Sequence, residues 1–122
     1  MESIRQKQVA ELIRRQFSMI LTEEGKYIYG DALVTVTGVK MSPDLALSKV
    51  YLSIFNHENP QEVILMMEEN YPRLKHALHQ KLRKQLRVMP EMRFYIDDTL
   101  TEVYKLEALF KKLHEEKQFG DD

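Results

Sequence analysis

The spacing of the apolar residues changes along this chain, and these changes limit the folds that it can adopt. From Val9 to Leu21 apolar residues recur three and four positions apart, which predicts an amphipathic helix over about residues 3–23. Alternation of apolar and polar residues replaces this pattern over residues 33–41 and 45–55, which predicts two strands. The first half of the chain is therefore predicted to be a helix followed by two strands.

The ends of these elements carry signals of their own. Ser3 and Gln6 have the spacing of a capping box, which predicts the start of the first helix. Gly25 and Gly30 bracket a predicted turn between that helix and the first strand. Gly38 shifts the alternation of the first strand by one residue, and a glycine at such a shift predicts a β-bulge.

The remaining chain is predicted to form three further helices and one strand. A short acidic helix over residues 61–69 ends at a break predicted at Asn70-Tyr71-Pro72, because Pro72 lacks a backbone N–H and disfavours a helical conformation of Tyr71. A second helix should run to Leu86, a strand should cover residues 92–96, and a last helix should follow Thr99. This α-β-β-α-α-β-α order has too few strands for a barrel, so it predicts an α+β fold with a three-stranded sheet and helices on one face.

Length and composition exclude several classes of protein. The 122 residues suit a single domain, which we place at residues 1–114, followed by a short frayed acidic tail at 115–122. The absence of cysteine excludes disulfides, thiolate zinc sites and a cysteine nucleophile. No apolar run approaches the ~20 residues that span a bilayer, and the N-terminus lacks the apolar core of a signal peptide. We therefore expect a soluble, cytoplasmic protein.

The charges are strongly segregated, although the formal net charge is only -1. Between Arg73 and Arg87 there are six cations, two histidines and no acidic residue. Leucines recur every four residues from Leu74 to Leu86, so they form one stripe that can dock a helix and leave its opposite face in water. Such a cationic face suits phosphate groups. The candidate RNA-binding residues are Arg73, Lys75, His76, Lys81, Arg83, Lys84 and Arg87.

Other candidate sites have simpler structural explanations. His76 and His79 lie three residues apart and could bind a metal ion, but the surrounding cations disfavour one. Asp97 and Asp98 could act as a pair of carboxylates, but their place before the last predicted helix suits its positive N-terminal end. The cations of the basic helix could also serve only to keep an amphipathic helix in solution, although such helices usually mix charges of both signs.

Tyr51, Arg93 and Tyr95 are predicted to lie on the sheet face opposite the apolar residues. Aromatic and cationic side chains on a sheet can stack on the bases of a nucleic acid. Packing between neighbouring strands is the commoner use of such residues, so both interpretations stay open.

Five short stretches occur in an order that is more specific than any of them alone. They are Gln8-Val9-Ala10, the run from Thr35 to Ala46, Lys49-Val50-Tyr51-Leu52, the run from Leu86 to Phe94, and the acidic pair Asp97-Asp98. Together they resemble the bacterial ribosome-binding factor A family over residues 3–113.

The resemblance implies a type II KH-like domain, with an α-β-β-α-α-β core plus a C-terminal helix. It implies a ribosome-assembly factor that binds the small (30S) subunit and assists the late processing and maturation of 16S rRNA without catalysis. The implied partners are the 30S subunit and 16S rRNA, with no cofactor, small-molecule substrate or membrane, and we expect a monomer. No P-loop, Gly-x-Gly-x-x-Gly or Gly-x-Ser-x-Gly motif argues for an enzyme instead.

The chain departs from the family at the break between the two middle helices. The family has an Ala-x-Gly kink there, and we place the corresponding positions at Pro72-Arg73-Leu74. No glycine occurs between Gly38 and Gly120, so a close approach of the backbone to phosphate that needs glycine is excluded at this break. Tyr29-Gly30-Asp31 also replaces the turn that is common before the first strand.

A second function is compatible with the same basic helix. A protein-interaction adaptor could use the helix to bind an acidic protein partner, and this binding would also depend on salt. Competition between rRNA and the bound partner would separate the two functions.

Overall fold

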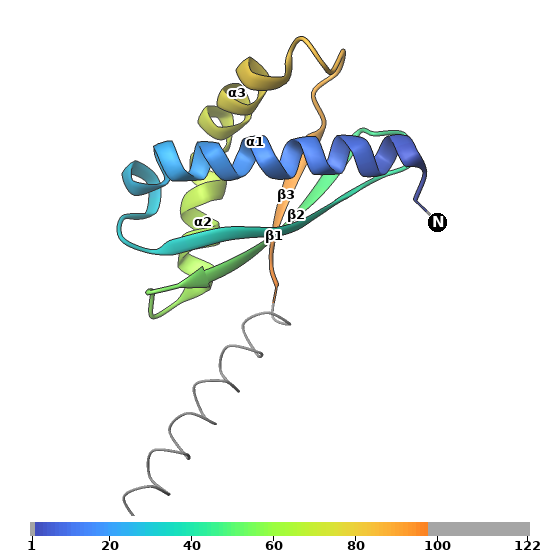
Figure 1. Ribbon diagram of the computed structural model, residues 1–122. Helices are drawn as coiled ribbons and strands as arrows, with labels where there is room; N and C mark the ends of the chain where they lie inside the picture. Colours follow the sequence, from blue (N-terminus) through green and yellow to red (C-terminus); the bar gives the residue numbers. More distant parts are fainter. Residues whose placement is uncertain (1, 98–122) are drawn as a thin grey trace, which may run out of the picture.

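The computed structural model describes residues 2–97 and shows one sheet covered by helices (Figure 1). The predicted helix after Thr99, the acidic tail and Asp98 lie outside the described residues. The elements are α1 (Ile4–Tyr29), β1 (Leu33–Met41), β2 (Leu47–Phe55), α2 (Pro60–Glu69), α3 (Tyr71–Leu82) and β3 (Glu91–Ile96).

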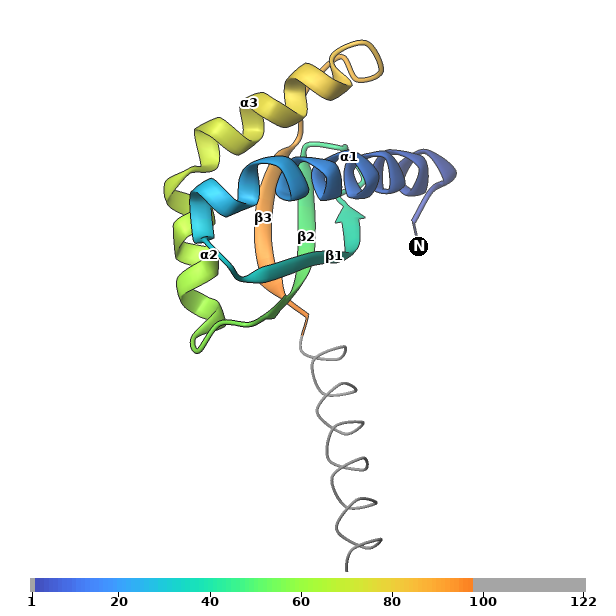
Figure 2. The same cartoon turned by 60° about the vertical axis from the view of Figure 1, so that its left-hand side comes forward.

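The sheet has the strand order β1-β2-β3 and is mixed. β1 and β2 pair antiparallel, whereas β2 and β3 pair parallel across the connection made by α2 and α3. α1 lies over β1, α2 lies against β2 and β3, and α3 packs beside α1, so the helices share one side of the sheet (Figures 1 and 2). Over residues 2–97, this arrangement confirms the predicted α+β fold with helices on one face.

The first helix is longer than predicted. It continues through Gly25 and ends at Tyr29. The C-cap residue Gly30 has a positive φ of 74°, which favours glycine, and its N–H donates to the carbonyl of Lys26. Gly25 is buried against the ring of Tyr29, and a Cβ built on it would lie 2.0 Å from the Tyr29 hydroxyl. The predicted turn at Gly25 is therefore wrong, because this glycine makes room for a neighbouring side chain within the helix.

The predicted capping box at the start of α1 is confirmed and has a second role. The Ser3 hydroxyl accepts from the N–H of Gln6, and the Gln6 side chain accepts from the N–H of Ser3. The same Gln6 amide donates to the carbonyl of Met41 at 3.0 Å, in a buried hydrogen bond. The helix cap is thus tied to the end of β1.

The two first strands confirm the predicted bulge and correct one strand boundary. The register of β1 and β2 shifts between Val36 and Gly38. β2 begins at Leu47, two residues later than predicted, because Leu45 has a φ of 61° and belongs to the turn. In this turn the Asp44 carboxylate accepts from the Ser42 hydroxyl and from the N–H of Ala46, and these hydrogen bonds lower the pKa of Asp44.

The apolar core lies between the sheet and the helices. Val50, Leu52 and Ile54 alternate along β2 and are buried, as their spacing predicts. The ring of Phe17 in α1 stacks on the ring of Phe94 in β3 with centroids 5.7 Å apart. Within residues 2–97 no helix combines the length and the apolar character that crossing a membrane requires.

The leucine stripe of α3 is buried as predicted, although the helix is shorter. Leu74, Leu78 and Leu82 are all 0% exposed, and Leu86 is buried beyond the helix end. α3 ends at Leu82 rather than Leu86, because the N–H groups of Gln85 and Leu86 both donate to the Leu82 carbonyl and form a turn. The stripe therefore fixes both the helix and the start of the loop after it.

Leu78→Ala should lower the free energy of unfolding by roughly 2–5 kcal/mol, because it leaves a cavity in a fully buried position. Leu65→Ala is the matched control, since Leu65 lies on α2 and is 56% exposed, and it should change stability by about 0.5 kcal/mol or less. Urea unfolding followed by circular dichroism measures both. Equal losses for the two variants would contradict the burial of the stripe.

Candidate nucleic-acid interface

The break between α2 and α3 is made by Asn70, not by the proline. Asn70 has φ −102° and ψ 18°, and its side-chain amide donates to the carbonyl of Met66 at 2.9 Å. Pro72 occupies the first turn of α3, where the missing N–H costs nothing. The break therefore lies within the predicted stretch Asn70-Tyr71-Pro72, although Asn70 rather than the proline makes it. Because φ of Asn70 is negative, this kink needs no glycine.

Three of the seven candidate RNA-binding residues are engaged in ion pairs with other elements. Their partners are acids of α1 and β3, so these pairs join α3 to its neighbours and reduce the local positive charge. The pairs are Arg73 with Glu24, Lys75 with Glu91 at 2.5 Å, and Lys81 with Glu23 at 3.8 Å.

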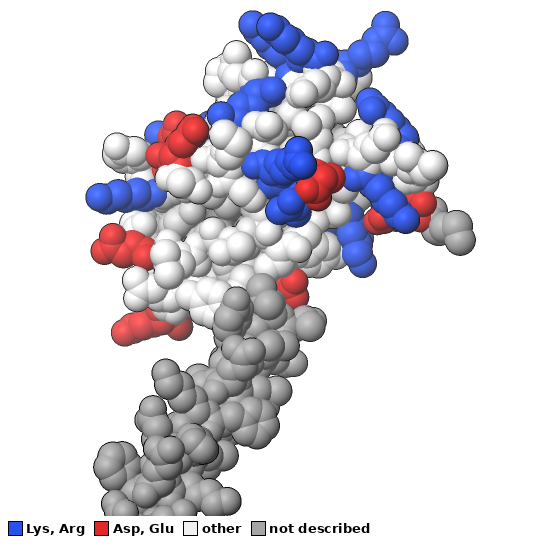
Figure 3. Space-filling model, viewed as in Figure 1, with Lys and Arg blue, Asp and Glu red and all other residues white. Residues whose placement is uncertain are grey.

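The remaining cations lie together at the far end of α3. Arg83, Lys84 and Arg87 are exposed, and none of them forms an ion pair with another residue in the described part of the chain. We call these three residues the distal basic cluster. Figure 3 shows Lys and Arg side chains gathered at the top of the view, over the end of α3 and the loop that follows it. Beside them Val88 is 77% exposed, so the cluster lies on a protruding loop.

The candidate His76 is exposed on α3. His76 and His79 have no third ligand within residues 2–97, where no group of three or more metal-binding side chains occurs. Asp97 accepts a hydrogen bond at 2.6 Å from the hydroxyl of Thr37, so this carboxylate is tied to the first strand.

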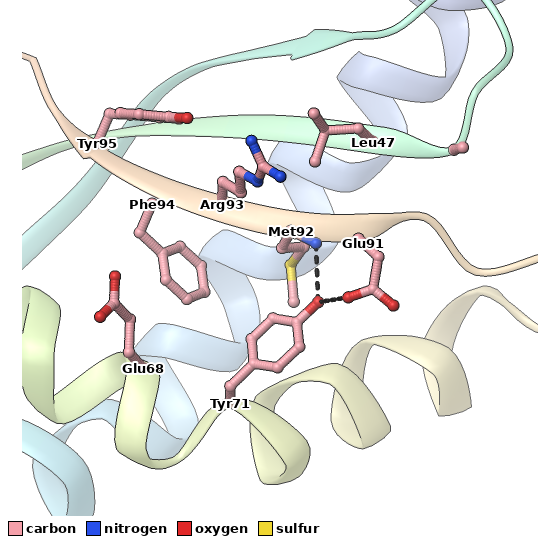
Figure 4. A pocket seen from close by; sticks show the side chains of 9 residues that line it. Leu47, Glu68, Tyr71, Glu91, Met92, Arg93, Phe94 and Tyr95 are labelled. Carbon is pink, nitrogen blue, oxygen red and sulfur yellow. Dashed lines mark hydrogen bonds between the residues drawn. The ribbon is translucent and has the colours of Figure 1, made fainter.

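A groove of about 580 Å³ lies between the helix break and β3, and Tyr71 fills part of it (Figure 4). The Tyr71 hydroxyl accepts from the N–H of Met92 at 2.8 Å and donates to the Glu91 carboxylate at 2.7 Å. Its ring meets the ring of Phe94 edge-on at 6.2 Å. Tyr71 therefore caps a backbone donor on the outer edge of β3.

Burial and hydrogen bonding shift the ionisation of the groups in this groove. Burial, followed by the nearby Glu91 carboxylate, raises the pKa of Tyr71 to about 12, although the bond from Met92 opposes this shift. The hydrogen bond from Lys75, followed by that from Tyr71, lowers the pKa of Glu91. Glu68 also lines the groove. Two carboxylates make it a poorer site for phosphate than the distal basic cluster.

Sequence reasoning identified the cations but missed their partners. Arg73 is separated from Glu24 by 49 positions in the sequence, and no local pattern links the two. The sequence pattern predicts no role for Tyr71 beyond its place before a proline, because its contact with β3 exists only in the folded chain. The cross-strand interpretation of Tyr51 and Tyr95 is confirmed, because their rings stack with centroids 5.6 Å apart.

A mixed three-stranded sheet, a broken helix pair and a cationic helix end define a small KH-like domain. The chain belongs to the ribosome-binding factor A family, whose sequence profile matches residues 5–110. It is 34% identical over 113 residues to ribosome-binding factor A of Cytophaga hutchinsonii, covering 93% of this chain and 85% of that protein. It is 35% identical over 114 residues to the same factor of Christiangramia forsetii, covering 90% and 85%.

Solved structures share the fold. The crystal structure of ribosome-binding factor A from Thermus thermophilus superposes with a TM-score of 0.63 at 20% identity, covering 75% of this chain and 94% of that one. A homology model of the Thermus thermophilus factor, fitted into a cryo-EM map of a 30S complex, gives 0.56 at 23% identity, covering 70% and 88%. The predicted family and KH-like fold are confirmed.

Stability should fall as the pH rises from about 10 to about 12. The unfolded chain loses the Tyr71 proton near pH 10, whereas the folded chain keeps it to about pH 12, so ionisation favours unfolding in this window. Urea unfolding at pH 9 and pH 11.5 measures the loss. Tyr71→Phe should lose less, and the pKa of Tyr29, which burial also raises, explains why some loss remains. Identical losses in both proteins would contradict this role of Tyr71.

Proposed function

We propose that this protein binds the small (30S) ribosomal subunit, contacts 16S rRNA and assists its late processing and maturation without catalysing a reaction. Membership of the ribosome-binding factor A family supports this function. The related factor that was fitted into a 30S complex supports the choice of subunit. A factor of this kind acts where ribosomes are assembled, so we place it in the cytoplasm.

The distal basic cluster carries the proposed RNA contact. Its three cations lack acidic partners within residues 2–97, so they can neutralise phosphates without first breaking an ion pair. Each neutralised phosphate releases counterions, which favours binding and makes it depend on salt. The two arginines can also form bidentate hydrogen bonds with phosphate oxygens.

The paired cations and His76 take a secondary role in this proposal. Arg73, Lys75 and Lys81 pair with acids of α1 and β3 along the body of α3, so part of their charge is already neutralised. Their exposed ion pairs are weak, so a nearby phosphate can still compete for them. The leucine stripe keeps the whole face turned away from the core.

Lys84→Glu combined with Arg87→Glu should weaken binding to 30S subunits by about tenfold or more, because both contacts become repulsive. Co-sedimentation with purified subunits at two salt concentrations measures the effect. The melting curve should stay unchanged, since both side chains are exposed.

The matched control is Arg5→Glu combined with Lys26→Glu, which makes the same change in net charge at two exposed positions of α1. It should leave co-sedimentation unchanged. Equal binding by the distal double variant and the wild type would refute the proposed contact. If the distal variant lost binding to an acidic protein that rRNA could not displace, the adaptor function would hold instead.

A further inference from the structure

The sheet face opposite the helices carries an unusual row of three cations. Strand register pairs Lys40 with Lys49, and Lys49 with Arg93, so the three residues lie side by side across β1, β2 and β3. All three are exposed, and no ion pair joins them to another described residue. Like charges directly opposite one another on neighbouring strands destabilise a sheet. The row is therefore unfavourable until an anion lies across it.

A pair of stacked tyrosines forms the next row on the same face. The register places Tyr51 beside Gly38 on one side and Tyr95 on the other. The two rings lie at 29° to each other, and Tyr95 is 37% exposed. The Lys40 ammonium lies 6.0 Å from the centre of the Tyr51 ring. Aromatic surface and positive charge thus adjoin on this face of the sheet.

The bulge in β1 leaves a hollow beside these rings. A Cβ built on Gly38 would meet nothing within 4 Å, so the absence of a side chain here keeps the floor of the hollow open. The hollow has a volume of about 330 Å³ and is lined by Gly38, Val39, Lys40, Tyr51 and Asp97. An opening of this size next to an aromatic ring can hold a planar base.

We propose that this open sheet face, defined by Lys40, Lys49, Tyr51, Arg93 and Tyr95, binds a single-stranded segment of RNA. Bases stack on the two tyrosines, and the backbone phosphates lie along the three cations. Stacking needs bases that are not already paired, so a duplex is not the ligand. The choice of RNA as the ligand rests on the function proposed above, in which the protein contacts 16S rRNA.

The acids near this face lie outside the phosphate track. Asp97 accepts from the Thr37 hydroxyl and lines the hollow, which takes a base and not a phosphate in this proposal. Glu91 is next to the row but accepts from Lys75 and Tyr71, which turn its charge toward α3. The face also lies on the opposite side of the sheet from α1 and α2, so it is separate from the distal basic cluster.

The first test uses a fluorescein-labelled single-stranded RNA octamer of mixed sequence and the full-length protein. Tyr95→Leu should raise the Kd about tenfold, because it removes one stacking surface and keeps an apolar side chain. Tyr27→Leu is the matched control, since Tyr27 is 77% exposed on α1, and its Kd should equal that of the wild type. Photo-cross-linking of the same octamer containing 4-thiouridine should label peptides that contain Tyr51 or Tyr95.

The second test measures the phosphate contacts through salt. Lys49→Gln combined with Arg93→Gln should reduce the slope of log K against log salt concentration by about 1.4, or about 0.7 for each lost contact. Arg5→Gln combined with Lys26→Gln is the control with the same loss of charge, and it should leave the slope unchanged.

Three results would overturn the proposal. The first is that Tyr95→Leu and Lys49→Gln/Arg93→Gln, the two open-face variants, both bind the octamer as tightly as the wild type and that neither Tyr51 nor Tyr95 is cross-linked. The second is normal octamer binding but weakened subunit binding by these variants, which would make the face a contact for a ribosomal protein. The third is tighter octamer binding after neutralisation. If the Tyr95→Leu and Lys49→Gln/Arg93→Gln variants bind the octamer normally while Lys84→Glu with Arg87→Glu no longer binds 30S subunits, the proposed function stands without this site. If the first two variants lose octamer binding while Lys84→Glu with Arg87→Glu still binds subunits, this site stands and the contact through the distal basic cluster does not.

Discussion

Burial of one leucine stripe determines how this domain presents its charge. Leu74, Leu78 and Leu82 are fully buried, so α3 can rotate in neither direction without exposing one of them. Since the cations lie on the other faces of the helix, the same packing turns the cationic side chains outward. The turn at Leu82 then carries the chain away from the core and places the distal basic cluster on a protruding loop. Packing of apolar side chains, rather than any electrostatic contact, therefore creates the positive surface.

The nearly neutral chain separates its charges by pairing some cations and leaving others without acidic neighbours. Acids of α1 and β3 meet the cations on the body of α3, where they link elements of the core. No described acid forms an ion pair with the cations beyond Leu82 or with the row of Lys40, Lys49 and Arg93. Two groups of three cations without acidic partners thus lie on opposite sides of the sheet. A polyanion responds to such local fields and not to the total charge.

Local signals in the sequence predicted the elements that depend on neighbouring residues. The capping box of Ser3 and Gln6 was predictable because both partners lie within one helical turn. The bulge at Gly38 was predictable from the phase of the alternation. Gly25 was misassigned, because a glycine that ends a helix and a glycine that admits the ring of Tyr29 have the same local pattern. The helix break lies within the predicted residues 70–72, although its geometry was assigned to the proline and not to Asn70.

The order of the elements, the buried stripes and the identity of the cations were determined by the sequence, because periodicity and charge are properties of consecutive residues. Only the tertiary structure decided which cations are paired. Arg73 meets Glu24 of α1, which is far away in the sequence. Lys40 lies beside Lys49, and Lys49 beside Arg93, through a strand register that includes a bulge. Such contacts join residues far apart in the chain, and their geometry follows from the packing of whole elements. The spacing of residues within one segment therefore cannot predict these contacts.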